Sequence, residues 1–182
     1  MEPTRPLTRA IMSPRRAARL ESLGCSSIAM QVECRRAEPN DSEAIADVYL
    51  RSRKELVTCA PLVHPDVEVR LWIRDGLIPS GSVTVAVVEG RVVGFMAVSK
   101  DAESSWVGQL YVLPESVGRG VGSRLLEVAR EELSPPIRLY TFQANQRARV
   151  FYERHGFVAV AFGDGSGNEE RCPDILYEWM RE

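Results

Sequence analysis

Three glycines at alternate positions form the most chemically suggestive stretch of the chain, Val117-Gly118-Arg119-Gly120-Val121-Gly122-Ser123. It follows a strand-like run and leads into a helix-like one. At the start of a helix the backbone N–H groups lack partners, and the helix dipole adds about half a positive charge there. Glycine has no Cβ, so a phosphate can approach the backbone closely. The segment therefore predicts an anion site to which Arg119 adds charge, with a tight turn that needs glycines as the alternative.

Neither of two common phosphate-binding motifs explains this segment. No Lys-Ser/Thr pair follows the glycines, as a P-loop requires, and the spacing is not that of the GxGxxG dinucleotide fingerprint. The four cysteines form no CxxC pair and have no zinc-ligand spacing with the two histidines. We therefore expect phosphate recognition by the backbone and no metal.

A second motif follows about twenty residues downstream, in the run 145–157. Its residues Asn145-x-x-Ala148-x-x-Phe151-Tyr152-Glu153-x-x-Gly156-Phe157 resemble a helix of the GNAT family of N-acetyltransferases. The run 117–122 aligns with that family's acyl-CoA motif, [Q/R]-x-x-G-x-[G/A], and 110–114 resembles its splayed central strand. The resemblance covers about residues 31–182. It departs at Val117, where the family has Gln or Arg, and one side-chain contact is lost there.

The resemblance implies a fold, a reaction and a set of residues. The fold would be α/β, a mixed and mostly antiparallel sheet of about seven strands, splayed at the acyl-CoA site and flanked by about four helices. The cosubstrate would be acetyl-CoA. Main-chain groups of the splayed strand would bind the pantetheine arm and the acetyl carbonyl, the glycine loop would hold the pyrophosphate, Asn145 would contact the CoA arm, and Tyr152 would protonate the departing thiolate. The implied cofactor-binding residues are Leu110, Tyr111, Val112, Val117, Gly118, Arg119, Gly120, Val121, Gly122, Ser123 and Asn145.

Two of these assignments have structural alternatives. Tyr152 could be only a core aromatic on the apolar helix face that also carries Ala148 and Phe151. Asn145 could be only the N-cap of its helix, because asparagine is a favoured residue there. Both interpretations stay open for each residue.

The acceptor end of the site is less clear. Glu169 and Glu170 lie in a polar, glycine-rich loop at 163–173, where either could bind a cationic amine or take its proton through water. The alternative is a solvated charged loop. Gln109 and Tyr140 stand where some family members place a glutamate base, and neither is a good base. The general base is therefore not identified.

The elements that must position these residues follow from hydrophobic periodicity and turn signals. Asn40 and Glu43 fit a capping box for a first helix, and a second helix after Pro65 would turn Trp72 inward. Hairpins mixed with strand–helix–strand crossovers imply a mixed sheet with helices on its faces. The predicted strands are 31–36, 82–88, 91–99, 105–112, 137–142, 157–162 and 175–179, and the last two helices are 122–133 and 145–155.

Composition sets the outer limits. The chain has 182 residues, 45% of them hydrophobic and 26% charged, as expected for one globular domain. Its apolar runs are shorter than the roughly 20 residues of a membrane-spanning helix. Basic residues form no aromatic-interleaved stripe, so no nucleic-acid or membrane partner is expected. The cysteine pattern is typical of reduced thiols in a cytoplasmic protein.

The chain divides at Met30. Residues 1–29 carry five arginines against two glutamates and few large apolar residues, which predicts a disordered or mis-annotated extension before an acyltransferase domain at 30–182. Translation starting at Met30 is one explanation, and an Arg-rich targeting peptide is the other.

The hypothesis is an acetyl-CoA-dependent N-acetyltransferase with a small-molecule amine as acceptor. The alternatives are a protein N-terminal or lysine acetyltransferase, or a non-catalytic CoA-binding module. A homodimer is left open as the assembly.

Overall fold

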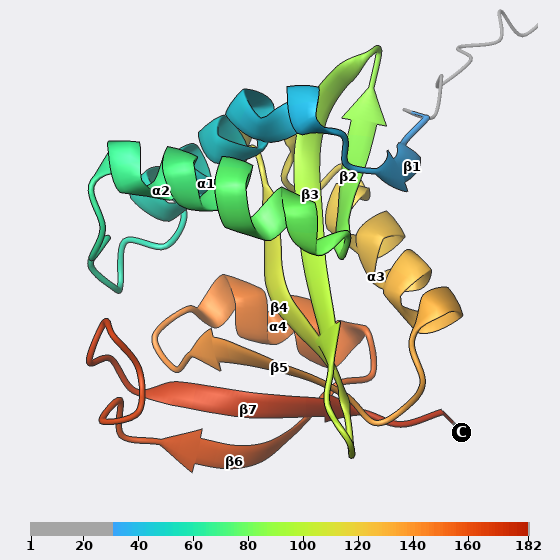
Figure 1. Cartoon of the computed structure of the whole chain (residues 1–182). Helices are drawn as coiled ribbons and strands as arrows, with labels where there is room; N and C mark the ends of the chain where they lie inside the picture. The colour runs from blue at the N-terminus through green and yellow to red at the C-terminus, as the bar shows by residue number, and fades with distance from the viewer. Residues whose placement is uncertain (1–30, 182) are drawn as a thin grey trace, which may run out of the picture.

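The computed structural model describes residues 31–181, which form one twisted sheet with helices on both faces (Figure 1). The strand order is β1-β2-β3-β4-β5-β7-β6, and every neighbouring pair is antiparallel except β4 with β5. This confirms the predicted mixed, mostly antiparallel sheet. The strands are β1 (Glu33–Arg36), β2 (Val83–Val88), β3 (Arg91–Lys100), β4 (Ser105–Val112), β5 (Ile137–Phe142), β6 (Val158–Gly163) and β7 (Asp174–Trp179), and the α-helices are α1 (Ser42–Glu55), α2 (Asp66–Trp72), α3 (Val121–Glu132) and α4 (Gln146–Arg154).

Helices α1 and α3 cover opposite faces of the sheet. On β3, a Cβ built on Gly94 would come within 3.0 Å of the Val121 side chain of α3. The next residue, Phe95, contacts the ring of Tyr111, which in turn meets the ring of Tyr49 on α1 at 4.9 Å. Successive strand side chains point to opposite faces, so these contacts separate the two helices. Each helix buries an apolar stripe against its own face.

Strands β4 and β5 diverge soon after they begin. Their parallel pairing is limited to Ser105 with Ile137 and Trp106 with Arg138. Beyond Trp106 the main chain of β4 no longer bonds to β5, and Figure 1 shows the two strands separating. The predicted splay is therefore present, and it exposes the β5-facing N–H and C=O groups of β4.

Register with β3 decides which β4 groups face the gap. Leu113 N–H donates to Val93 O at 2.8 Å, and backbone groups alternate in direction along a strand. The main chain of Tyr111 therefore points to β3, whereas that of Leu110 and Val112 points into the splay. Of the three strand residues predicted to hold the acyl arm, Leu110 and Val112 direct their main-chain N–H groups into the gap, and Tyr111 contributes its side chain. The Val112 carbonyl already accepts from Ser52 Oγ.

Two local predictions were wrong. The capping box uses Glu38 and Asp41 instead of Asn40 and Glu43, because a 3₁₀ turn at Pro39–Asp41 precedes α1 and Asp41 accepts the Glu38 N–H at 2.8 Å. Trp72 is 42% exposed, and its ring meets that of Tyr49 in an edge-type contact with centroids 6.0 Å apart. After Trp72 the helix continues as a π-type segment at Ile73–Leu77, which the 3.6-residue pattern does not anticipate.

The predicted extension at 1–29 lies outside the described residues. Within 31–181, none of the helices has the length and apolar character needed to cross a bilayer.

Candidate active site

A cleft of about 720 Å³ occupies the splay between β4 and β5. The carboxyl-end halves of both strands line it, together with the starts of α3 and α4. Its other wall comes from the end of α1 and from the β6–β7 loop, residues 164–173. The cleft therefore joins the predicted phosphate loop to the predicted acceptor loop.

The glycine loop presents a continuous row of free backbone donors. From Gly118 to Ser123, none of the N–H groups has an acceptor among the described residues, and the first bond of α3 is Arg124 N–H to Gly120 O at 2.9 Å. Gly118 (φ 79°) and Gly120 (φ 85°) adopt the left-handed conformation that favours glycine. Six successive donors at a helix N-terminus are the arrangement that binds a phosphate.

The predicted cofactor residues differ in how they face the cleft. Val121 is 1% exposed, with its side chain in the core, so only its N–H is available. Arg119 and Gly120 are exposed and Ser123 is half-buried, and none of the three belongs to the cleft lining. The predicted residues that line the cleft are Leu110, Tyr111, Val112, Val117, Gly118, Gly122, Asn145, Tyr152 and Glu170.

His155 is a positioning residue that the sequence did not connect to the glycine loop. Its Nδ1 lies 2.7 Å from Phe151 O, and its Nε2 lies 2.9 Å from Ser123 Oγ. A carbonyl only accepts, so Nδ1 carries the proton, and in a neutral ring Nε2 accepts from the Ser123 hydroxyl. This bridge ties α4 to the first turn of α3. The last turn of α4 thereby fixes the loop that would hold the pyrophosphate.

Tyr152 is both a packed aromatic and a cleft residue. It is 8% exposed, and its ring packs on Phe157 and Tyr177 at centroid distances of 5.9 and 6.1 Å. Burial raises the pKa of its hydroxyl, so the group stays protonated at neutral pH. No described residue bonds to that hydroxyl, whereas Tyr177 donates to Glu153 at 2.7 Å. The Tyr152 hydroxyl is thus a protonated, uncommitted donor in a cleft residue.

Asn145 caps α4 and still lines the cleft. Its Oδ1 accepts from Ala148 N–H at 3.2 Å, which confirms the cap. Its side-chain nitrogen has no acceptor among the described residues. The two interpretations of Asn145 are therefore compatible, because one end of the amide caps and the other is available.

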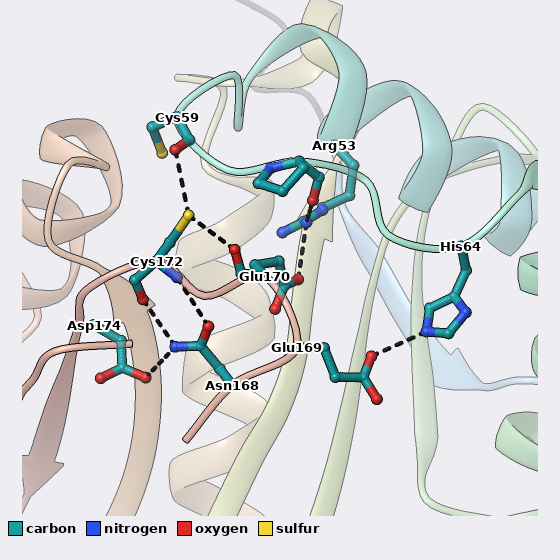
Figure 2. Close-up of polar contacts among 9 residues, drawn as sticks. Arg53, Cys59, His64, Asn168, Glu169, Glu170, Cys172 and Asp174 are labelled. Atoms are coloured by element: carbon teal, nitrogen blue, oxygen red, sulfur yellow. Dashed lines mark hydrogen bonds and ion pairs between the residues drawn. The ribbon is translucent and has the colours of Figure 1, made fainter. Parts of the chain in front are cut away.

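The acceptor side of the cleft lies between the segment that follows α1 and the β6–β7 loop (Figure 2). Arg53, from α1, donates through Nη2 to Glu170 Oε1 at 2.9 Å and to Pro61 O at 2.8 Å. Glu169, one residue earlier, points the other way, and its carboxylate lies 2.9 Å from His64 Nε2. Glu170 therefore lines the cleft, whereas Glu169 is exposed outside it.

The β6–β7 loop is held in one shape by Asn168. Its Nδ2 donates to Cys172 O at 2.8 Å and to Asp174 Oδ2 at 2.9 Å, while its Oδ1 accepts from Cys172 N–H at 3.1 Å (Figure 2). At Gly165 (φ 89°) a Cβ would come within 2.6 Å of the Cys172 backbone. These contacts fix the direction of Glu170.

Asn168→Ala should loosen this loop. Each of the three bonds contributes about 1 kcal/mol, so we expect a loss of about 3 kcal/mol of stability and a melting temperature lower by about 6–12 °C in thermal unfolding. The KM for the acceptor should rise several-fold, with acetyl-CoA affinity unchanged. The exposed Asn40→Ala is the matched control. An unchanged melting temperature would show that the three bonds do not hold the loop.

Residues that could hold a metal do not gather in the described part of the chain: no group of three or more His, Cys, Asp or Glu side chains is placed for it. The arrangement instead offers main-chain donors, one protonated phenol and one cleft carboxylate. These groups suit acyl transfer from a phosphate-bearing thioester.

Comparison with known proteins agrees with this geometry. The family model described as an acetyltransferase (GNAT) domain matches residues 79–159. An uncharacterized N-acetyltransferase of Archaeoglobus fulgidus is 33% identical over 158 residues, spanning 76% of this chain and all of that protein. The peptidyl-lysine N-acetyltransferase YiaC of Escherichia coli is 26% identical over 153 residues, spanning 80% of this chain and 94% of that protein.

The fold has solved relatives as well. The PaiA N-acetyltransferase of Thermoplasma acidophilum, solved with coenzyme A, superposes with a TM-score of 0.61 at 20% identity, covering 82% of this chain and all of that one. The chain belongs to the GNAT family. It is an acetyl-CoA-dependent N-acetyltransferase, as the sequence resemblance predicted.

Proposed function

We propose that the protein transfers the acetyl group of acetyl-CoA to the primary amine of a small molecule, by direct attack within a ternary complex. The observation that carries the proposal is the continuity of one cleft from the glycine loop, through the splay, to Glu170. Holding both reactants in one groove supplies much of the rate acceleration, because it replaces a bimolecular encounter.

The splayed strand would bind the thioester. Val112 N–H points into the gap and is the proposed oxyanion donor, a contact worth about 3 kcal/mol in comparable enzymes. Val112 O already accepts from Ser52 Oγ at 2.7 Å, which fixes α1 against this end of β4. Leu110 would bond the pantetheine arm through its main chain. The N–H groups of 118–123 would hold the pyrophosphate.

Tyr152 would act as the general acid. The ammonium first loses a proton to solvent water. The neutral amine nitrogen then attacks the thioester carbon, the C–S bond breaks, and the phenol gives its proton to the departing sulfur. The raised pKa suits this role because the hydroxyl must be protonated when the thiolate forms. The proton released by the amine passes to solvent water, and a water molecule restores the phenol.

Glu170 is the proposed contact for the acceptor amine. Its carboxylate lies in the cleft, and its pairing with Arg53 holds it in place. Glu169 belongs to the same prediction, but its bond to His64 directs it to the outer surface. Protein acetylation is the second candidate, favoured by the E. coli relative, which is a peptidyl-lysine N-acetyltransferase. A non-catalytic CoA-binding module is the third.

An acceptor screen that follows free thiol release separates these candidates. The proposal expects thiol release with small amines and a matching acetylated product by mass spectrometry. Release only with lysine-containing or N-terminal peptides would select protein acetylation. CoA binding without release for any acceptor would leave a binding module.

A further inference from the structure

Arg53 is a buried charge in the acceptor half of the cleft. Its side chain is 3% exposed, yet it is part of the cleft lining. Its guanidinium lies 5.5 Å from the centre of the Phe142 ring, at the end of β5. The preceding residue, Ser52, bonds to the end of β4. Arg53 therefore lies against the end of β5, and the preceding residue ties its helix to the end of β4.

The donors of Arg53 are only partly used. Both of its hydrogen bonds to the described residues leave from Nη2, one to Pro61 O and one to Glu170 Oε1. Its Nε is buried and has no acceptor among the described residues. A guanidinium carries five N–H donors and keeps its charge at any working pH. Nη1 also makes no hydrogen bond among the described residues and, unlike Nε, is not closed off from solvent, so an oxygen that reached it from the cleft would be stabilising.

The neighbouring carboxylates of the cleft do not supply that oxygen. Asp174 accepts from Asn168, and Asp164 accepts from Ser166 N–H. Glu170 accepts from Arg53 Nη2 through Oε1, and its side chain makes no other hydrogen bond within residues 31–181, so Oε2 remains available. The Arg53 guanidinium and the Glu170 carboxylate thus lie side by side, the first with unused N–H donors and the second with an unused oxygen.

We infer that the acceptor is a free α-amino acid, whose carboxylate binds Arg53 and whose amino group lies against Glu170. The inference rests on the proposed function and names its substrate class. An α-amino acid carries the complementary charges on adjacent atoms, and charge-assisted bonds are the strong ones. A polyamine or aminoglycoside would bring only positive charge and leave the Arg53 donors unmet.

The location fits attack by the α-amine. Arg53 sits next to the strand end whose Val112 N–H is the proposed oxyanion donor. In an α-amino acid the nitrogen is two bonds from the carboxylate carbon, so a carboxylate bound to Arg53 would keep the α-nitrogen near that strand end. The reacting nitrogen and the thioester carbon would then meet at the mouth of the splay.

Matched acceptors test the inference directly. For several side chains, the free amino acid, its carboxamide and the decarboxylated amine are compared at fixed acetyl-CoA, with thiol release and mass spectrometry of the product. We expect the free amino acid to exceed both others at least 10-fold in kcat/KM. Equal or better rates with the carboxamides or amines would overturn the inference and leave the proposed function intact. Thiol release with no acceptor would instead remove the proposed function.

Variants of Arg53 separate recognition from folding. Arg53→Lys keeps the charge but removes the planar donor fork, and Arg53→Met removes both. We expect Arg53→Lys to raise the amino-acid KM at least 10-fold, with a smaller effect on matched amines and none on acetyl-CoA affinity. Arg51→Lys, on the same helix and exposed on a pair with Glu115, is the control. An equal rise in KM for amino acids and for matched amines in Arg53→Lys would show that Arg53 does not bind the carboxylate.

Discussion

Gly120→Glu is expected to abolish acetyl-CoA binding, with affinity lowered at least about 100-fold, or about 2.8 kcal/mol. Gly120 has φ 85°, a conformation that a side chain strains, and it lies inside the row of free N–H groups from Gly118 to Ser123. A carboxylate there would take those donors for itself and repel a diphosphate. Isothermal titration calorimetry with acetyl-CoA measures the loss.

Gly90→Glu is the control for backbone strain and added charge. Gly90 has φ 76°, nothing lies within 4 Å of a Cβ built there, and it sits in the β2–β3 turn away from the cleft. This variant should bind acetyl-CoA as the unmodified protein does. Retained binding in Gly120→Glu would refute the assignment of the loop.

Tyr152→Phe should lower kcat by about 100-fold while the dissociation constant for acetyl-CoA stays nearly unchanged. The substitution keeps the ring that packs on Phe157 and Tyr177 and removes only the hydroxyl. Because burial raises the pKa of this phenol above its ordinary value, its deprotonation cannot limit the rate below about pH 10. Steady-state kinetics and calorimetry together check both halves of the prediction.

Tyr177→Phe is the matched control for Tyr152→Phe, because it also removes one tyrosine hydroxyl. Its hydroxyl donates to Glu153 and takes no part in the cleft lining. That variant should lose about 1 kcal/mol of stability with little change in kcat. Full activity of Tyr152→Phe would assign the residue to core packing alone.

The strands and helices follow closely from the sequence because local signals agree with the fold. Pro114 ends β4, and Gly156 adopts φ 75° just beyond α4. The predicted helix at 122–133 is observed at Val121–Glu132. The glycine loop could be recognised for the same reason: its donors, its conformation and its helix are all neighbours in the chain.

Contacts between distant segments could not be predicted in this way. Glu169 and Glu170 are adjacent in sequence and look equivalent, yet one bonds to His64 outside the cleft and the other to Arg53 within it. Arg53 lies in the charged run 51–55 at the end of a helix, and such a run usually indicates a solvent-exposed surface. Its burial depends on Pro61 and Glu170, which only the folded chain brings together.

Side-chain bridges were missed for a related reason. His155, one residue beyond the end of α4, bonds to Ser123, and no local pattern in the sequence indicates a bridge between residues 32 positions apart. Helical periodicity places Trp72 on the inward face. In the structure a π-type segment begins directly after it, and Trp72 is half exposed. Periodicity describes one element at a time, whereas these outcomes depend on how two elements pack.

Calorimetric titration with coenzyme A and, in parallel, with pantetheine tests the central claim most directly, because the two ligands share the thiol arm and differ by the nucleotide and its diphosphate. If the amides of residues 118–123 hold the diphosphate, coenzyme A should bind at least about 100-fold more tightly than pantetheine. No measurable heat with coenzyme A, or equal affinity for both ligands, would contradict the account.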